Sequence, residues 1–199
     1  MPSWKWPCGL VHGGGPGGGG RVAFGAVHIA PVLRDRPGDH AGLLAHELSH
    51  LHLFQRIGTL AMMRLPVWFR EGYPTMVADW GGAGRVAPDT AIFALVHGRH
   101  FEAEEDATLL APHRWEHFKV SAPMFYRQSA LLVDYLRRRD PPAFDRMMGA
   151  VGARRRFGDA VRDAYGQPLP VLWRDFRAGL RAHPAARWDF QSASEGAPR

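Results

Sequence analysis

Cysteine is nearly absent from this chain of 199 residues, which contains only Cys8. A single cysteine excludes both an internal disulfide framework and a cysteine-rich zinc site. Long apolar runs are also lacking, because none reaches the roughly 18–20 residues that a membrane-spanning helix requires. Hydrophobic residues still make up 46% of the chain, which predicts one globular domain with a substantial core. Any metal bound by such a domain must be held by histidine and carboxylate side chains.

Acidic residues are fewer than basic ones, with 19 Asp and Glu against 25 Lys and Arg, for a net charge of +6. Arginines gather at 137–139 and 154–156. Such a balance is compatible with nucleic acid or an anionic membrane surface as a partner. We interpret the arginines as a solvated helical surface and expect no nucleic-acid partner. A basic nucleic-acid-binding domain stays open as an alternative.

The first 20 residues have little that could pack into a core. They end in the low-complexity run "HGGGPGGGG", so residues 1–20 are predicted to form a disordered Gly-rich arm. This stretch lacks the apolar segment of a signal peptide. The default expectation is therefore the cytoplasm, whereas export stays open if the true N-terminus lies upstream.

Beyond the arm, the chain is expected to be mainly α (α+β). The β-forming residues in "RVAFGAVHIAP" at 21–31 predict one short strand. Apolar spacing and Pro and Gly positions predict helices over 40–57, 65–80, 124–140, 142–152, 157–166 and 169–183. The pattern is weak over 85–122. We expect a metal-site half at 21–84, a helical lobe at 85–183 and a flexible tail at 184–199.

The stretch "AHELSHLHLFQR" at 45–56 contains two histidines four positions apart, His46 and His50. Residues four apart on a helix lie on one face, one turn from each other. Glu47 is rotated by about 100° from His46, which places it beside the same ion. In HExxH metallopeptidases the two histidines bind the metal and the glutamate is the general base.

A catalytic zinc usually has a third protein ligand. The metzincin pattern would require a histidine at position 56 and a glycine at 53, where this chain has Arg56 and Leu53. That class is excluded. The next helix offers Glu71 in "WFREGY", twenty-one positions beyond His50.

The two stretches together resemble a known family. "HELSH" followed by "LPVWFREGYPTMVADW" at 65–80 is similar to the gluzincin peptidases, specifically the bacterial peptidase MA-like family, in which the second stretch reads approximately P-x-W-x-x-E-G. "YRQSALLVDYL" at 126–136 and "FGDAVRDAYGQPLPVLWRDFRAGL" at 157–180 resemble later helices of that family. The resemblance covers roughly residues 21–180.

The resemblance implies a zincin-like metallopeptidase domain with a short N-terminal β element, an HExxH helix, a Glu-ligand helix and a C-terminal helical lobe. Zn²⁺ would be held by His46, His50 and Glu71, and Glu47 would be the general base. Tyr126 would donate to the oxyanion, the alternative being a half-buried core tyrosine. The substrate would be a peptide or protein. A catalytically inactive zinc-binding domain of the same fold is the alternative function.

Two features depart from the family pattern. Zinc-bound histidine normally donates its other ring N–H to a nearby oxygen, and some gluzincins supply an Asp four residues after the glutamate ligand. This chain has Thr75 there, so Asp79, two turns beyond Glu71, is expected to take that role. Gluzincins also place several strands before the HExxH helix, whereas only one is predicted here.

The remaining notable side chains are expected to be structural. The pairs His97 and His100, and His113 and His117, spell no ligand motif and are interpreted as solvated or loop residues. Aromatic residues at helical spacings are expected in the core: Trp68, Phe69, Phe125, Tyr135, Trp173 and Phe176.

Overall fold

The structure is a computed structural model that describes residues 20–23, 26–29, 37–79, 83, 86–106 and 119–187. The predicted arm lies outside these ranges except for Gly20, which belongs to the first strand. The elements are β1 (Gly20–Ala23), β2 (Ala26–Ile29), α1 (Pro37–Arg64), α2 (Val67–Val77), α3 (Pro88–Val96), α4 (Ala122–Arg139), α5 (Pro141–Gly152), α6 (Phe157–Tyr165), α7 (Leu169–Leu180) and the short 3₁₀ helix η3 (Pro184–Arg187). The prediction of a mainly helical chain is confirmed for the described residues.

Helix boundaries follow local signals in the sequence. Asp140 caps α5 by accepting a hydrogen bond on Oδ1 from the Ala143 backbone N–H at 2.9 Å, and Pro141 fills the first helical position, where a missing N–H costs nothing. Gly166 ends α6 with a φ of 68°, the left-handed conformation that favours glycine. These signals explain why the predicted helix ends lie within a few residues of the observed ones.

The helix that carries the two histidines ends where the sequence predicts. The span α1 consists of two helical segments that meet at Gly58, where the backbone leaves the helical region with φ 77° and ψ 169°. Glycine tolerates this positive φ without the clash that a side chain would cause. The segment before Gly58 is the predicted helix, and the second segment, which continues to Arg64, was not predicted.

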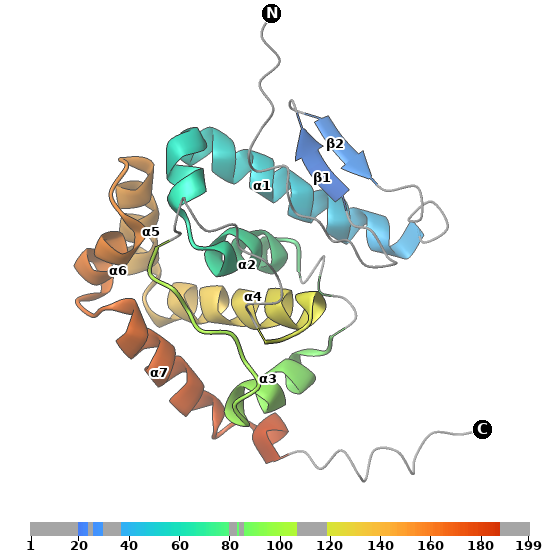
Figure 1. Cartoon of the computed structure of the whole chain (residues 1–199), viewed down its shortest axis with the longest axis vertical. Coiled ribbons are helices and arrows are strands. Elements are labelled where there is room, and N and C mark those ends of the chain that lie inside the picture. Colours follow the sequence, from blue (N-terminus) through green and yellow to red (C-terminus); the bar gives the residue numbers. More distant parts are fainter. Residues whose placement is uncertain are drawn as a thin grey trace, which may run out of the picture.

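The predicted single strand is two strands. β1 and β2 pair antiparallel, with Gly20 opposite Ile29 and Ala23 opposite Ala26. The hairpin lies against α1 (Figure 1). The β-forming residues correctly predicted β structure over this stretch, but β propensity does not show where a chain turns back on itself.

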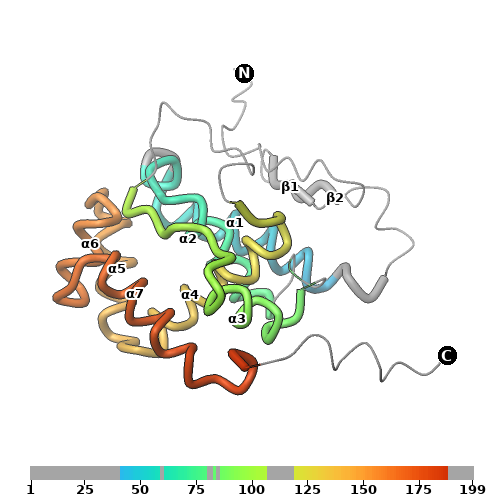
Figure 2. Tube along the Cα trace, turned by 60° about the horizontal axis from the view of Figure 1, so that its bottom comes forward, coloured from blue at the N-terminus to red at the C-terminus, as the bar shows by residue number. Residues whose placement is uncertain are grey.

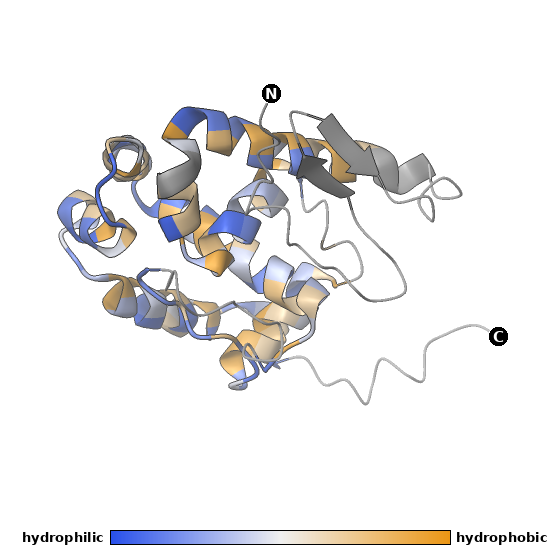
Figure 3. Cartoon of the chain, turned by 45° about the horizontal axis from the view of Figure 1, so that its top comes forward, coloured by the Kyte–Doolittle hydropathy of each residue, from blue (hydrophilic) through white to orange (hydrophobic). Residues whose placement is uncertain are grey.

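The centre of the molecule is α2, which lies between α1 and α4 (Figure 1). Figure 2 shows α5, α6 and α7 gathered at the opposite end from the start of α1. Each helix carries both hydrophobic and hydrophilic residues (Figure 3), as expected for helices that bury one face.

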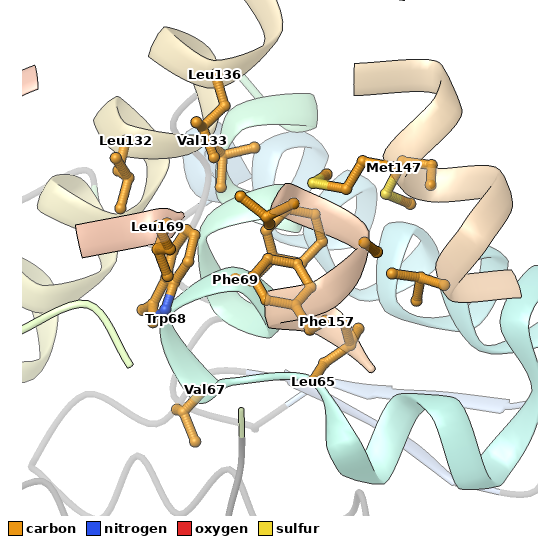
Figure 4. Packing of buried hydrophobic residues seen from close by; sticks show 14 of the residues in the cluster. Leu65, Val67, Trp68, Phe69, Leu132, Val133, Leu136, Met147, Phe157 and Leu169 are labelled. Carbon is orange, nitrogen blue, oxygen red and sulfur yellow. The ribbon is translucent and has the colours of Figure 1, made fainter. Parts of the chain in front are cut away.

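The core forms where α2 meets its neighbours. Trp68 and Phe69 on α2 are buried together with Phe157 on α6 (Figure 4), and the Phe69 and Phe157 rings are 4.8 Å apart. The expected core aromatics are confirmed: Trp68, Phe69, Phe125, Trp173 and Phe176 are buried, and Tyr135 packs against them partly buried. Glu71 therefore lies on α2, the helix whose residues Trp68 and Phe69 form part of the core.

Arg127 ties the segment before α3 to α4. This buried side chain donates from Nε to the Val86 carbonyl at 2.7 Å and from Nη2 to the Ala83 carbonyl at 3.1 Å. Gln128 likewise donates to the Arg99 carbonyl at 2.8 Å. Burying a guanidinium is tolerated when it is hydrogen-bonded in this way. These bonds fix the start of α4 to the segments on either side of α3.

The first four residues of the predicted flexible tail form a helical turn. Residues Pro184–Arg187 form η3, which contacts α3 and buries Ala185 and Ala186. Two small apolar side chains are enough to hold one turn against the neighbouring helix. Residues 188–199 lie outside the described part of the chain.

The arginine runs lie on the surface. All six residues of 137–139 and 154–156 are exposed, and several form ion pairs with aspartates: Arg138 with Asp134, Arg139 with Asp175, Arg155 with Asp163 and Arg156 with Asp106. Among the described residues, no helix combines the length and the apolar composition needed to cross a bilayer.

Candidate metal centre

Three potential metal ligands from α1 and α2 converge on one point. The Nε2 atoms of His46 and His50 are 3.1 Å apart. Glu71 Oε2 lies 3.8 Å from His46 Nε2 and 3.4 Å from His50 Nε2. Within the described part of the chain, this is the cluster of three His, Cys, Asp or Glu side chains that could hold a metal ion.

The spacing of these atoms fits a small tetrahedral cation. Ligand atoms about 2.0–2.1 Å from a tetrahedral zinc lie about 3.3–3.4 Å from one another. The three measured distances, 3.1, 3.4 and 3.8 Å, bracket that value. In addition, Oε2 of Glu71 is buried without a hydrogen-bond partner in the described structure. A buried carboxylate oxygen requires a partner, and a cation between the two rings would supply it.

Glu71 is held as a carboxylate. Its side chain is only 1% exposed, and burial alone would raise its pKa. The neighbouring His50 and His46 act in the opposite direction and together hold the pKa of Glu71 below its ordinary value. A deprotonated, inward-facing carboxylate is the form that binds a metal.

The close approach of α2 and α4 sets the position of Glu71. Gly72 packs directly on Ser129, and a Cβ atom at position 72 would lie 2.7 Å from the carbonyl carbon of Ser129. Backbone atoms cannot move aside as the end of a flexible side chain can. Only glycine at this position lets α2 lie so close to α4, and this explains the glycine after the glutamate in "REGY".

Glu47 lies beside the cluster and is buried. It is 7% exposed. Burial raises its pKa to about 7, with the charge of His46 lowering it and the charge of Glu71 raising it further. A carboxyl group that titrates near neutrality can both accept and release a proton. Glu47 is thus a buried carboxyl group close enough to His46 and Glu71 for their charges to act on its pKa, and its role as a general base stays a prediction.

Tyr126 faces the same cluster from α4. Its ring is 6.1 Å from that of His46 in an edge-on arrangement. Burial, followed by the charges of Glu71 and Glu47, raises the pKa of Tyr126 above its ordinary value. The hydroxyl therefore stays protonated and remains a hydrogen-bond donor. The ring is also partly buried against the core, so both interpretations of Tyr126 keep support and its role at an oxyanion stays a prediction.

The partner of the His46 ring is Thr75, and the expectation for Asp79 was wrong. Thr75 Oγ1 lies 3.3 Å from His46 Nδ1 and donates to the Glu71 carbonyl at 2.8 Å. Asp79 follows the C-cap of α2 and is exposed. Thr75 stands four positions after Glu71, which is the position where the family pattern places an aspartate. The sequence position therefore pointed to the right residue, although threonine is not the aspartate of the family pattern.

Arg70 was missed by the sequence reasoning. Its Nε is 4.0 Å from Glu71 Oε1, the carboxylate oxygen that does not face the histidines most closely. Adjacent residues on a helix do not usually face each other, so spacing gave no reason to expect this contact. The guanidinium adds positive charge at the edge of the cluster.

The other histidines do not join the site. His97 is exposed and its ring stacks on Phe93 at 3.9 Å. His100 contacts Arg177 and lies 3.5 Å from Glu102. His97 is thus solvated as predicted, whereas His100 lies in a loop as predicted but has a side chain that is only 9% exposed. His113 and His117 lie outside the described residues.

Comparison with protein-family models, with curated proteins and with solved structures gave no match to the chain. The interpretation of the site consequently depends on its residues and their geometry.

Proposed function

We propose that the protein is a zinc-dependent peptidase of the gluzincin type. The observation that carries the proposal is the convergence of His46 Nε2, His50 Nε2 and Glu71 Oε2 to within 3.1–3.8 Å. Two imidazole nitrogens and one carboxylate oxygen are the protein ligands of catalytic zinc sites in this class. The metal proposed is therefore Zn²⁺.

The fold is proposed to be a reduced zincin-like domain. In this assignment α1 is the HExxH helix, α2 is the Glu-ligand helix, the β1–β2 hairpin is the N-terminal β element, and α3 to α7 form the helical lobe. The packing of α2 between α1 and α4 supports this assignment. The substrate is proposed to be a peptide or protein.

The chain's own residues divide the chemistry between them. A zinc ion in such a site lowers the pKa of a bound water and polarises the carbonyl of the substrate. The Glu47 carboxylate, which lies close to His46 and Glu71, accepts a proton from water and passes it to the leaving amine nitrogen. The Tyr126 hydroxyl, kept protonated by its environment, donates a hydrogen bond to the developing oxyanion.

The proposal is tested first by the metal content of the purified protein. We expect about one zinc per chain in the wild type, measured by elemental mass spectrometry on protein purified without chelator or metal-affinity tag. Glu71→Ala should contain markedly less, because only two of the three ligands remain. A wild type that takes up no zinc after reconstitution would overturn the proposal.

Turnover is tested with a variant that preserves the ligands. Glu47→Gln has nearly the same shape but cannot accept a proton, so we expect it to keep its zinc and to lose about 10²–10⁴-fold in peptide cleavage. A peptide library incubated with the wild type and with Glu47→Gln measures the difference. Zinc-loaded wild type that cleaves no better than Glu47→Gln would instead identify the inactive zinc-binding domain.

A further inference from the structure

Thr75 joins the two helices that carry the ligands, and it belongs to neither the ligand set nor the catalytic residues. It lies in α2, one turn after Glu71, and is completely buried. We propose that Thr75 is a positioning residue whose hydroxyl fixes the tautomer and orientation of the His46 ring for metal binding. This inference rests on the metal site of the proposed function.

The direction of the two hydrogen bonds follows from the number of protons available. The Glu71 carbonyl can only accept, so the bond at 2.8 Å uses the single hydroxyl proton of Thr75. The contact at 3.3 Å between Thr75 Oγ1 and His46 Nδ1 then requires a proton from the ring. His46 therefore carries its proton on Nδ1.

A proton on Nδ1 determines what the other ring nitrogen can do. In a neutral imidazole, Nε2 is then the unprotonated nitrogen, and its lone pair points toward His50 Nε2 and Glu71 Oε2. The Thr75 hydroxyl is hydrogen-bonded both to the His46 ring and to the Glu71 backbone carbonyl. It therefore connects two of the proposed metal ligands. It fixes the ring of one helix relative to the backbone of the other.

A simpler role for the Thr75 hydroxyl is a local hydrogen bond within its own helix. Serine and threonine within helices often bond the carbonyl four residues back with no further purpose. Ser49 does so on α1, donating to the Ala45 carbonyl at 2.7 Å, and it lies between the two histidines in sequence. Thr75 differs in that its oxygen also meets the ring of His46. Ser49 therefore provides a matched control.

The first test measures zinc affinity by competition with a chromophoric chelator. Thr75→Val keeps the shape but removes the hydroxyl, and we expect it to bind zinc about 10–100-fold more weakly, as is typical when the partner of a ligating histidine is removed. Thr75→Ser restores the hydroxyl and should bind nearly as the wild type does. Ser49→Ala should also bind like the wild type.

The second test reads the tautomer directly in the wild type. Nitrogen-15 NMR of the zinc-free and zinc-loaded protein should show His46 protonated at Nδ1, with Nε2 the nitrogen that responds to zinc. This measurement decides the matter even if Thr75→Val fails to fold. A wild type protonated at Nε2 of His46, or a folded Thr75→Val with unchanged zinc affinity, would overturn the role of Thr75.

These outcomes are distinguishable from failure of the proposed function. If the wild type binds no zinc, the metal site itself is wrong. If the wild type binds one zinc and Thr75→Val binds it equally well, the metal site stands and the positioning role of Thr75 falls.

Discussion

At the scale of single residues, the site uses one residue type in two opposite states. Glu47 and Glu71 are both buried glutamates, yet the pKa of Glu47 is raised to about 7 and that of Glu71 is held below its ordinary value. Burial acts on both in the same direction. The difference is that Glu71 faces both histidines closely, whereas burial dominates for Glu47. Opposite shifts of this kind separate a proton-accepting group from a permanently charged one.

The raised pKa of Glu47 predicts how the stability of the metal-free protein changes with pH. Between pH 4.5, the ordinary pKa, and about 7, the folded pKa, the folded state holds a proton that the unfolded state has released. Stability must therefore fall as the pH rises through this window. Relative to Glu47→Gln, chelator-treated wild type should lose at most about 3 kcal/mol between pH 5 and 8.

Urea unfolding of both proteins at the two pH values measures this loss. The lowered pKa of Glu71 acts only below pH 4.5 and is common to both proteins, so it cancels. Parallel stability curves for wild type and Glu47→Gln would contradict the shifted pKa.

At the scale of elements, the contact between α2 and α4 controls the site. Gly72→Ala would place a Cβ 2.7 Å from backbone atoms of Ser129, so the helices must separate or the chain must strain. We expect a loss of about 1–3 kcal/mol in the free energy of unfolding, as for other overpacked cores. Zinc content should fall too, since Glu71 moves with α2.

Gly149 in α5 is the matched control for this variant. It is an exposed helical glycine with nothing within 4 Å of an added Cβ. Gly149→Ala should stabilise by about 0.5–1 kcal/mol through helix propensity. Chemical unfolding and metal analysis of the two variants side by side provide the comparison. A Gly72→Ala protein with wild-type stability and zinc content would show that the close approach is dispensable.

The start of α5 gives a second prediction at this scale. Asp140→Ala removes the side chain that accepts the Ala143 N–H, and such caps are worth about 1 kcal/mol. Thermal unfolding should show that loss without a change in zinc content, because α5 carries no ligand. Asp145→Ala, at an exposed position of the same helix, should change stability by no more than about 0.5 kcal/mol.

At the scale of the whole molecule, metal binding should be coupled to folding. The three ligands come from two helices and converge only in the folded state, so zinc binds the folded chain in preference to the unfolded one. At a free zinc concentration 1,000 times the dissociation constant, the gain is about 4 kcal/mol. We expect chelator to lower the Tm of the wild type by roughly 8–16 °C.

Calorimetry with and without chelator measures this shift. Glu71→Ala is the control, because chelator should change the Tm of a protein that binds zinc weakly only slightly. Equal chelator sensitivity of the two proteins would indicate that the metal acts elsewhere on the chain.

Local sequence signals were sufficient for much of the fold and of the site. Most of the helices and the shared face of His46 and His50 depend on residues within a turn or two of each other, whereas α3 lies in the stretch where the pattern is weak and was not predicted. The signals failed where distant segments meet. The β-forming residues over 21–31 could not distinguish one strand from the β1–β2 hairpin, and polarity alone could not show that η3 packs against α3.

The sequence by itself determined that His46 and His50 share one helical face with Glu47 beside them, because a spacing of four fixes this wherever a helix forms. It also indicated Glu71 as the third ligand through the motif around it. Only the tertiary structure decided that Thr75, and not Asp79, partners the His46 ring. The physical reason is that this choice depends on how α1 and α2 are placed against each other, and that placement is set by long-range contacts such as Gly72 against Ser129.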